Sequence, residues 1–278
     1  MLKAHSLKPH SSFSLCSRLF ITAFACVTSA SVVAQEPQSD VQDMSDPLAV
    51  YTQAGVGYTD KGINLKVGQT YDTKDPLTAA MNIIEVKGAL GDAFGWRGQN
   101  TTNNSIDSFR FRNFGANLQT GLANQLDINY TLKPNLVAEE SADISYSFIQ
   151  ALPKMGPVNL YPLAGAGVSI GNSALEDDGT TDSGYSIMGT YGLIGMYGKL
   201  QLTDKIWLNY NPFWLTTISG SDTYKDNYYG RGDSHLLTHE FAASYQITPR
   251  FNVRYFANWN TNVDFLDGDH RIEFNYQI

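Results

Sequence analysis

The chain has 278 residues, of which 19 are Lys or Arg and 27 are Asp or Glu, and its formal net charge is −8. This acidic balance argues against nucleic acid as a partner, because neutralising phosphates requires Lys and Arg. After residue 34 no run of about 18 apolar residues occurs, which excludes membrane-spanning helices from that part of the chain.

Residues 1–34 have the features of a secretory signal peptide. Lys3, Lys8 and Arg18 form a basic n-region, Leu19–Val33 is the apolar core, and cleavage is expected near Ala34. Cleavage would take the 19 basic residues to 16, against 27 acidic residues, for a net charge of −11.

Both cysteines, Cys16 and Cys26, lie within this signal. The mature chain would therefore contain no thiol, which excludes disulfides, thiolate metal sites and cysteine nucleophiles. A lipoprotein signal at Cys26 is an alternative, but Ala23–Ala25 fits the required small-residue triplet poorly.

The next segment, Gln35–Pro47, is polar and acidic, which predicts a flexible lead-in. From Leu48 to Ile278, segments of alternating polarity bounded by turn residues predict about twelve strands. Ten strands remain the alternative if the first pair is not in the wall. The expected strands are Leu48–Tyr58, Gly62–Asp72, Leu77–Leu90, Ile106–Leu118, Leu122–Leu132, Ala142–Leu152, Val158–Gly171, Gly184–Leu202, Ile206–Ser219, His235–Ile247, Phe251–Val263 and Arg271–Ile278.

Short and long connections alternate between these strands. The turns around Pro76, Gly121, Pro153, Asp204 and Pro249 are short, whereas the intervening connections are mostly longer and rich in Asp, Asn, Gly and Ser. Alternate connections of an up-and-down barrel lie at the same end, so this pattern predicts short turns at one end and long loops at the other. The connection Thr59–Lys61 is short and departs from the pattern.

The last strand is apolar or aromatic at every second position. Ile272, Phe274, Tyr276 and Ile278 share one face, and charged or amide residues alternate with them. This segment resembles the closing strand of a Gram-negative outer-membrane β-barrel, although Ile278 stands where that family usually has Phe or Trp. The resemblance implies a single antiparallel all-β barrel over residues 48–278, located in the Gram-negative outer membrane. It also implies that the lead-in Gln35–Pro47 and the short turns are periplasmic and that the long loops are extracellular. It also implies contact with outer-membrane lipid and lipopolysaccharide, and recognition of this strand by the barrel-assembly machinery.

In such a barrel, alternation assigns each strand residue to lipid or to the lumen. An Arg or Lys facing lipid at mid-depth would cost about 2–4 kcal/mol, so charged strand residues are expected to face the lumen. The predicted lumen residues are Glu85, Lys87, Arg110, Arg112, Glu240, Arg254, Arg271 and Glu273. The predicted lipid-facing residues are Ile84, Val86, Phe109, Phe111, Ile128, Tyr130, Ile144, Tyr146, Phe148, Phe241, Tyr245, Val253, Tyr255 and Trp259.

Three functions fit these features. A porin-like channel would pass small polar solutes through the charged lumen. A barrel filled by its ion pairs would instead be structural, or would bind partners through its loops. Barrels of about eight strands are filled by side chains and those of about sixteen leave a channel, so about twelve strands do not decide between them.

The third hypothesis is a hydrolase at the extracellular rim. Ser234 and His235 begin one strand, and Asp269 and His270 precede the last, so a nucleophile, a base and an orienting carboxylate could converge there.

Three other short motifs resemble known functional motifs, but their expected place in a strand or loop accounts for each of them. Gly165–Gly171 resembles a phosphate loop, but no helix follows it, and glycines in barrel strands relieve crowding. His235 and His239 would lie about 13 Å apart on a strand, which is too far to share a metal ion. Arg231–Asp233 matches an adhesion tripeptide that loops contain by chance. We therefore expect neither a metal nor a cofactor.

Overall fold

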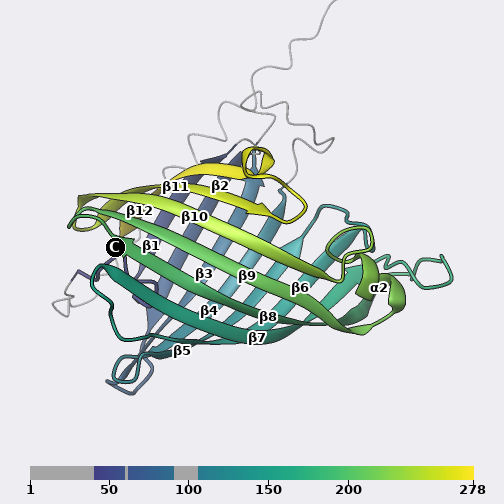
Figure 1. Cartoon of the computed structure of the whole chain (residues 1–278), viewed down its shortest axis with the longest axis horizontal. Coiled ribbons are helices and arrows are strands. Elements are labelled where there is room, and N and C mark those ends of the chain that lie inside the picture. The colour runs from purple at the N-terminus through teal and green to yellow at the C-terminus, as the bar shows by residue number, and fades with distance from the viewer. Residues whose placement is uncertain (1–40, 60–61, 91–105) are drawn as a thin grey trace, which may run out of the picture. The chain divides into compact units, whose positions relative to one another are not determined.

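The computed structural model describes residues 41–59, 62–90 and 106–278, and these form a closed antiparallel β-barrel (Figure 1). Each strand pairs with its neighbours in sequence, and β1 pairs with β12. The described residues contain twelve strands, so the predicted up-and-down barrel and its strand number are confirmed. The strands are β1 Gln53–Thr59, β2 Gly62–Tyr71, β3 Thr78–Ala89, β4 Ser108–Asn117, β5 Leu122–Thr131, β6 Glu140–Gln150, β7 Val158–Asn172, β8 Tyr185–Gln201, β9 Ile206–Gly220, β10 His235–Thr248, β11 Phe251–Asn260 and β12 Asp269–Gln277.

The barrel closes through the first and last strands. The register runs without interruption from Gln53 opposite Gln277 to Thr59 opposite Arg271. Beyond β12, the backbone N–H of Ile278 donates to the carbonyl of Thr52 at 2.9 Å. Neither terminal strand is therefore left with an open edge.

The apolar strand residues face outward and the polar ones face the lumen, as the alternation in the sequence predicts. Outward-facing residues are largely exposed, for example Ile84 at 57% and Phe148 at 56%. Inward-facing polar residues are buried, for example Asn252 at 1% and Glu273 at 7%. The outer surface is thus apolar and the interior is polar along most strands.

The first strand begins later than the alternation suggested. Residues 48–52 lie outside β1, and Leu48 and Val50 pack against an apolar cluster on the inner wall. Their apolar side chains are buried inside the barrel and not on its outer surface. The cluster consists of Met81, Ile83, Phe114, Ala116, Ala123, Ile149, Tyr161 and Leu163.

The connection between β9 and β10, expected to be a loop, contains the short helix α2, Asp222–Asn227, seen at the right of Figure 1. Ser221 caps α2 by accepting a hydrogen bond from the backbone N–H of Tyr224 at 3.1 Å. Asp177, in the β7–β8 connection, accepts from the backbone N–H of Thr223 at 2.7 Å and of Asp222 at 3.1 Å. These bonds hold the pKa of the Asp177 carboxyl below its usual value.

A second short helix, η2, Phe265–Asp267, lies between β11 and β12. Among the described residues, no helix has the length and apolar character needed to cross a membrane.

The glycine-rich segment Gly165–Gly171 lies within β7 and is not a loop. A Cβ at Gly167 would lie 2.5 Å from Cζ of Tyr191 and 2.6 Å from the carbonyl oxygen of Ile144. Glycine at this position lets the Tyr191 ring lie flat against the inner wall.

We expect Gly167→Ala to destabilise the barrel by about 1–3 kcal/mol, because the added methyl overpacks this contact. The matched control is Gly192→Ala, where the nearest atom to a Cβ is the flexible Cδ1 of Ile218 at 3.2 Å. Urea unfolding followed by heat-modifiable gel mobility measures both variants. Equal stability of the two variants would contradict the proposed contact.

Candidate functional site: the charged lumen

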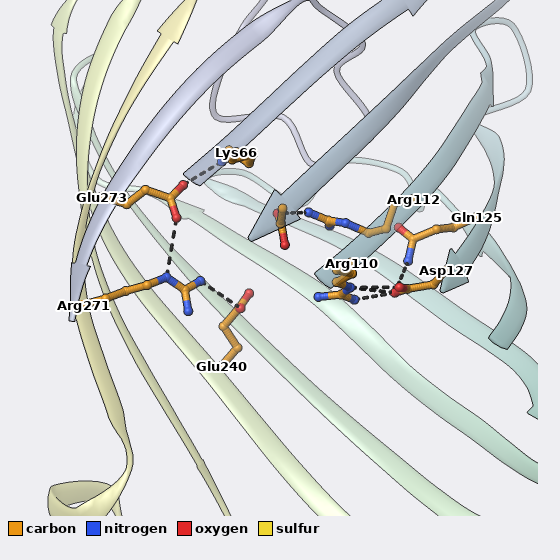
Figure 2. A network of polar contacts seen from close by, with 9 residues as sticks. Lys66, Arg110, Arg112, Gln125, Asp127, Glu240, Arg271 and Glu273 are labelled. Atoms are coloured by element: carbon orange, nitrogen blue, oxygen red, sulfur yellow. Dashed lines mark hydrogen bonds and ion pairs between the residues drawn. The ribbon is translucent and has the colours of Figure 1, made fainter. Parts of the chain in front are cut away.

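One ion-pair group joins three strands on the inner wall (Figure 2). Nζ of Lys66 lies 2.6 Å from Oε1 of Glu273. Arg271 lies 3.5 Å from the other oxygen of Glu273 and 3.9 Å from the carboxylate of Glu240. The side chains of Arg271 and Glu273 are each 9% exposed, so this group lies inside the barrel and not on its surface.

A second group lies on β3, β4 and β5. Arg110 forms a two-point contact with Asp127, which includes an Nε–Oδ1 distance of 2.8 Å, and Gln125 donates to Asp127 at 3.2 Å (Figure 2). Arg112 pairs with Glu85. The strand register explains these ion pairs. Arg110 lies opposite Glu85 and Arg112 lies opposite Asp127, and each Arg pairs with the acid diagonal to it on the neighbouring strand.

Two cations of the lumen are not neutralised in this way. Among the described residues, no carboxylate lies within 4.0 Å of Lys87 or Arg254. Arg254 instead donates to Ser244 and Asn209, both at 2.9 Å, and its guanidinium lies 4.7 Å from the ring centre of Phe256.

Two cavities lie along this interior. The inner cavity, of about 210 Å³, is bordered by all the predicted lumen residues. The outer cavity, of about 370 Å³, is also bordered by residues of β5, β6, β8 and β9. Lys87, Arg110, Gln125 and Tyr197 border both cavities, so they form the boundary between them.

Sequence reasoning missed three charged lumen residues. They are Lys66, Asp127 and Asp143. Lys66 pairs with Glu273, Asp127 neutralises Arg110, and Asp143 borders the outer cavity. The same alternation rule could have found Lys66, Asp127 and Asp143, because each lies in a predicted strand on the face opposite its apolar residues.

Residues 41–47, predicted as part of a flexible lead-in, are packed in the structure. Lys199 of β8 contacts Asp43 at 3.3 Å and also bonds Ser45. The hydroxyl of Tyr161 donates to Asp46 at 3.1 Å. Burial tends to raise the pKa of Asp43, but the hydrogen bonds from Ser45 and the charge of Lys199 outweigh it and lower that pKa. Residues 44–47 border the inner cavity, so this segment narrows the barrel at the end with short turns.

Side chains around α2 narrow the opposite part of the lumen. The hydroxyl of Tyr228 donates to Oδ1 of Asp143 at 2.6 Å, and that of Tyr224 donates to Ser169 at 3.1 Å. Burial raises the pKa of Tyr228, and the adjacent Asp143 carboxylate raises it further, so the phenol stays a neutral donor. The β9–β10 connection is thereby tied to the inner face of β6 and β7.

In the predicted hydrolase site, His270 and Asp269 are already engaged by other residues. His270 uses Nδ1 with the hydroxyl of Tyr255 and Nε2 with the carbonyl of Phe265, both at 2.7 Å. Asp269 pairs with Arg271 at 3.3 Å on the inner side, so Asp269 and His270 face opposite sides of β12. No ring nitrogen of His270 is left to activate Ser234.

The other two histidines of the described residues, His235 and His239, lie in aromatic contacts of β9, β10 and β11. The ring of His235 stacks on Trp214 with centres 4.5 Å apart. Nδ1 of His239 lies 2.8 Å from the hydroxyl of Tyr210, and its ring stacks on Trp259 at 4.9 Å. His235 and His239 thus stack on different aromatic residues, as expected for two separate positions along a strand.

The predicted assembly segment lies at the closing strand. Ile272, Phe274, Tyr276 and Ile278 are exposed by 41–62% on the outer side. This exposure leaves the face free for contact with lipid or with another protein, and its recognition by the assembly machinery stays a prediction.

The geometry defines a class of fold: a closed antiparallel barrel with an apolar outer face and a charged lumen. No family model matches the chain, and no curated protein matches its sequence. Two of the solved structures that share its fold are outer-membrane channels. The NanC porin has a TM-score of 0.50 and 9% identity, over 83% of this chain and 100% of that one. The COG4313 outer membrane channel from Pseudomonas putida F1 has a TM-score of 0.50 and 7% identity, over 88% of this chain and 100% of that one.

At these identities the likeness concerns the fold. The shared feature is the closed antiparallel barrel of these two outer-membrane channels.

We expect Glu273→Gln to destabilise the barrel by about 3–5 kcal/mol, because it removes the shared partner of two buried cations. The amide keeps the shape of the side chain, so packing is retained. The control is Asp72→Asn, which breaks the fully exposed Lys74–Asp72 pair and should leave stability unchanged. Urea unfolding in lipid vesicles measures both, and a Glu273→Gln barrel as stable as the wild type would exclude a structural role for this group.

Proposed function

We propose that this protein is a porin-like channel for the passive passage of small polar solutes across the outer membrane. The observation that carries the proposal is the pair of cavities inside the barrel, which share a boundary of Lys87, Arg110, Gln125 and Tyr197. A solute would cross this boundary between charged and amide side chains, which can replace part of its hydration.

The size of the cavities supports small solutes. The volumes of about 210 and 370 Å³ are far below the open lumen of a large porin, because the ion pairs fill much of the cross-section. The border of the inner cavity carries six cationic and four acidic side chains, an excess that favours anions over cations.

The second candidate function, a closed structural or surface-interaction barrel, is favoured by the narrowing at both ends of the lumen. Residues 44–47 border one cavity, and Tyr228 and Tyr229 border the other. A measurement of current separates the two candidates.

The test is single-channel conductance of the refolded protein, without its predicted signal, in a planar lipid bilayer. Heat-modifiable gel mobility shows beforehand that the barrel has folded. A steady ohmic conductance in KCl supports the channel, whereas a folded barrel that passes no current would overturn it in favour of the closed barrel.

Charge at the boundary should set the ion selectivity of this current. Arg110→Gln removes one cation and leaves the Asp127 carboxylate without its partner, so we expect the chloride-to-potassium permeability ratio to fall. Reversal potentials in a KCl gradient measure the ratio. Lys205→Gln removes an equal charge from an exposed turn and should leave the ratio unchanged. Identical ratios for wild type and Arg110→Gln would place Arg110 outside the pathway.

Release of residues 41–47 from the lumen should widen the pathway. Lys199→Met removes the cation that holds Asp43 and Ser45, so we expect a larger single-channel conductance than in the wild type. Lys205→Met is the control at the adjacent turn. Unchanged conductance in Lys199→Met would mean that this segment does not limit the current.

A further inference from the structure

Lys87 has an unusual position in the lumen. It borders both cavities, yet no carboxylate lies within 4.0 Å of its ammonium group among the described residues. A cation inside a barrel requires compensation from an opposite charge or from hydrogen bonds. Lys87 is therefore the group at this boundary that is free to receive an anion.

The neighbouring charges are already engaged. Arg110 is neutralised by Asp127, and Asp143 accepts hydrogen bonds from Tyr228 and Ser169. These contacts occupy the acids of the outer cavity, so within the part of the chain that the structure describes Lys87 has no carboxylate in direct contact.

One wall of the outer cavity is apolar. It consists of Leu163, Leu193, Leu215, Tyr197 and Phe213. The rings of Tyr197 and Phe213 meet edge to face with centres 5.4 Å apart, which holds both rings in place beside the boundary. Tyr229 borders the same cavity and adds a third aromatic ring to its lining.

We propose that the outer cavity binds a small amphipathic organic anion, a single carboxylate joined to one ring or a short apolar body. The carboxylate would pair with Lys87, and the ring would pack against the Leu, Tyr and Phe wall. This inference rests on the proposed channel in that the bound anion would be a solute of the pathway.

The lining of the outer cavity favours an amphipathic organic anion over an inorganic anion or a sugar acid. A simple inorganic anion would make no use of the apolar wall. A sugar acid would place its hydroxyl groups against leucine side chains, where they would lose hydrogen bonds to water without replacement. A cavity of about 370 Å³ also exceeds the volume of a single-ring carboxylate, so such a molecule can enter with some water.

The test uses benzoate as the probe and benzamide as its neutral isostere. Isothermal titration of the refolded protein in detergent measures binding, which does not depend on whether the barrel conducts. We expect benzoate to bind the wild type at least about 10-fold more tightly than benzamide or acetate, since a charge-assisted contact and an apolar wall both contribute.

Variants assign the binding to Lys87. Lys87→Met should weaken benzoate binding at least about 10-fold, Lys87→Arg should restore it, and Lys205→Met should bind as the wild type does. Heat-modifiable mobility and benzamide binding show that each variant is folded.

The outcomes separate this inference from the proposed channel. Equal binding of benzoate and benzamide, binding unchanged in Lys87→Met, or no binding of benzoate to the folded wild type would each overturn the anion site, whatever the conductance. Selective benzoate binding in a barrel that passes no current would support the site and overturn the channel.

Discussion

Closure between β1 and β12 is the constraint on which the rest of this structure depends. A backbone N–H or C=O left unpaired in lipid costs several kcal/mol, so a strand wall that spans the membrane can have no free edge. The continuous register from Gln53–Gln277 to Thr59–Arg271 meets this requirement. Once the ring is closed, successive side chains can face only lipid or lumen, and every charged strand residue must find its partners inside.

The lumen shows how far that requirement is met. Arg110 and Asp127 neutralise each other, and Glu273 joins Lys66 and Arg271. The pairing is incomplete, however, because Lys87 and Arg254 have no carboxylate partner among the described residues, and Lys87 lies at the boundary of two cavities. A barrel evolved only for stability would be expected to leave no such charge, because an uncompensated buried cation is costly. This imbalance connects the energetics of the fold with the proposed passage and binding of anions.

The barrel and its lumen were largely predictable from sequence, since alternation fixes both a strand and its buried face. The strand predicted as Gly62–Asp72 is observed as Gly62–Tyr71. Residues 48–52 were not predictable, because apolar residues such as Leu48 alternate in the same way whether they face lipid or the inner cluster. Nor was α2, whose N–H groups depend on Asp177 from another connection. The hydrolase hypothesis placed Asp269 and His270 in one site, but these are adjacent residues of β12 and their side chains face opposite sides of the strand.

The central claim is that the inward-facing side chains line a water-filled pathway. Both cysteines lie within residues 1–34, so protein refolded without that segment has no other thiol when a single cysteine is placed in the barrel. The direct measurement is the current through Ser145→Cys, which faces the outer cavity, during treatment with a charged thiol reagent. Ile144→Cys, on the outer face, is the control. The account predicts rapid modification and a changed current for Ser145→Cys alone, whereas an unreactive Ser145→Cys or a current unchanged by its modification would contradict it.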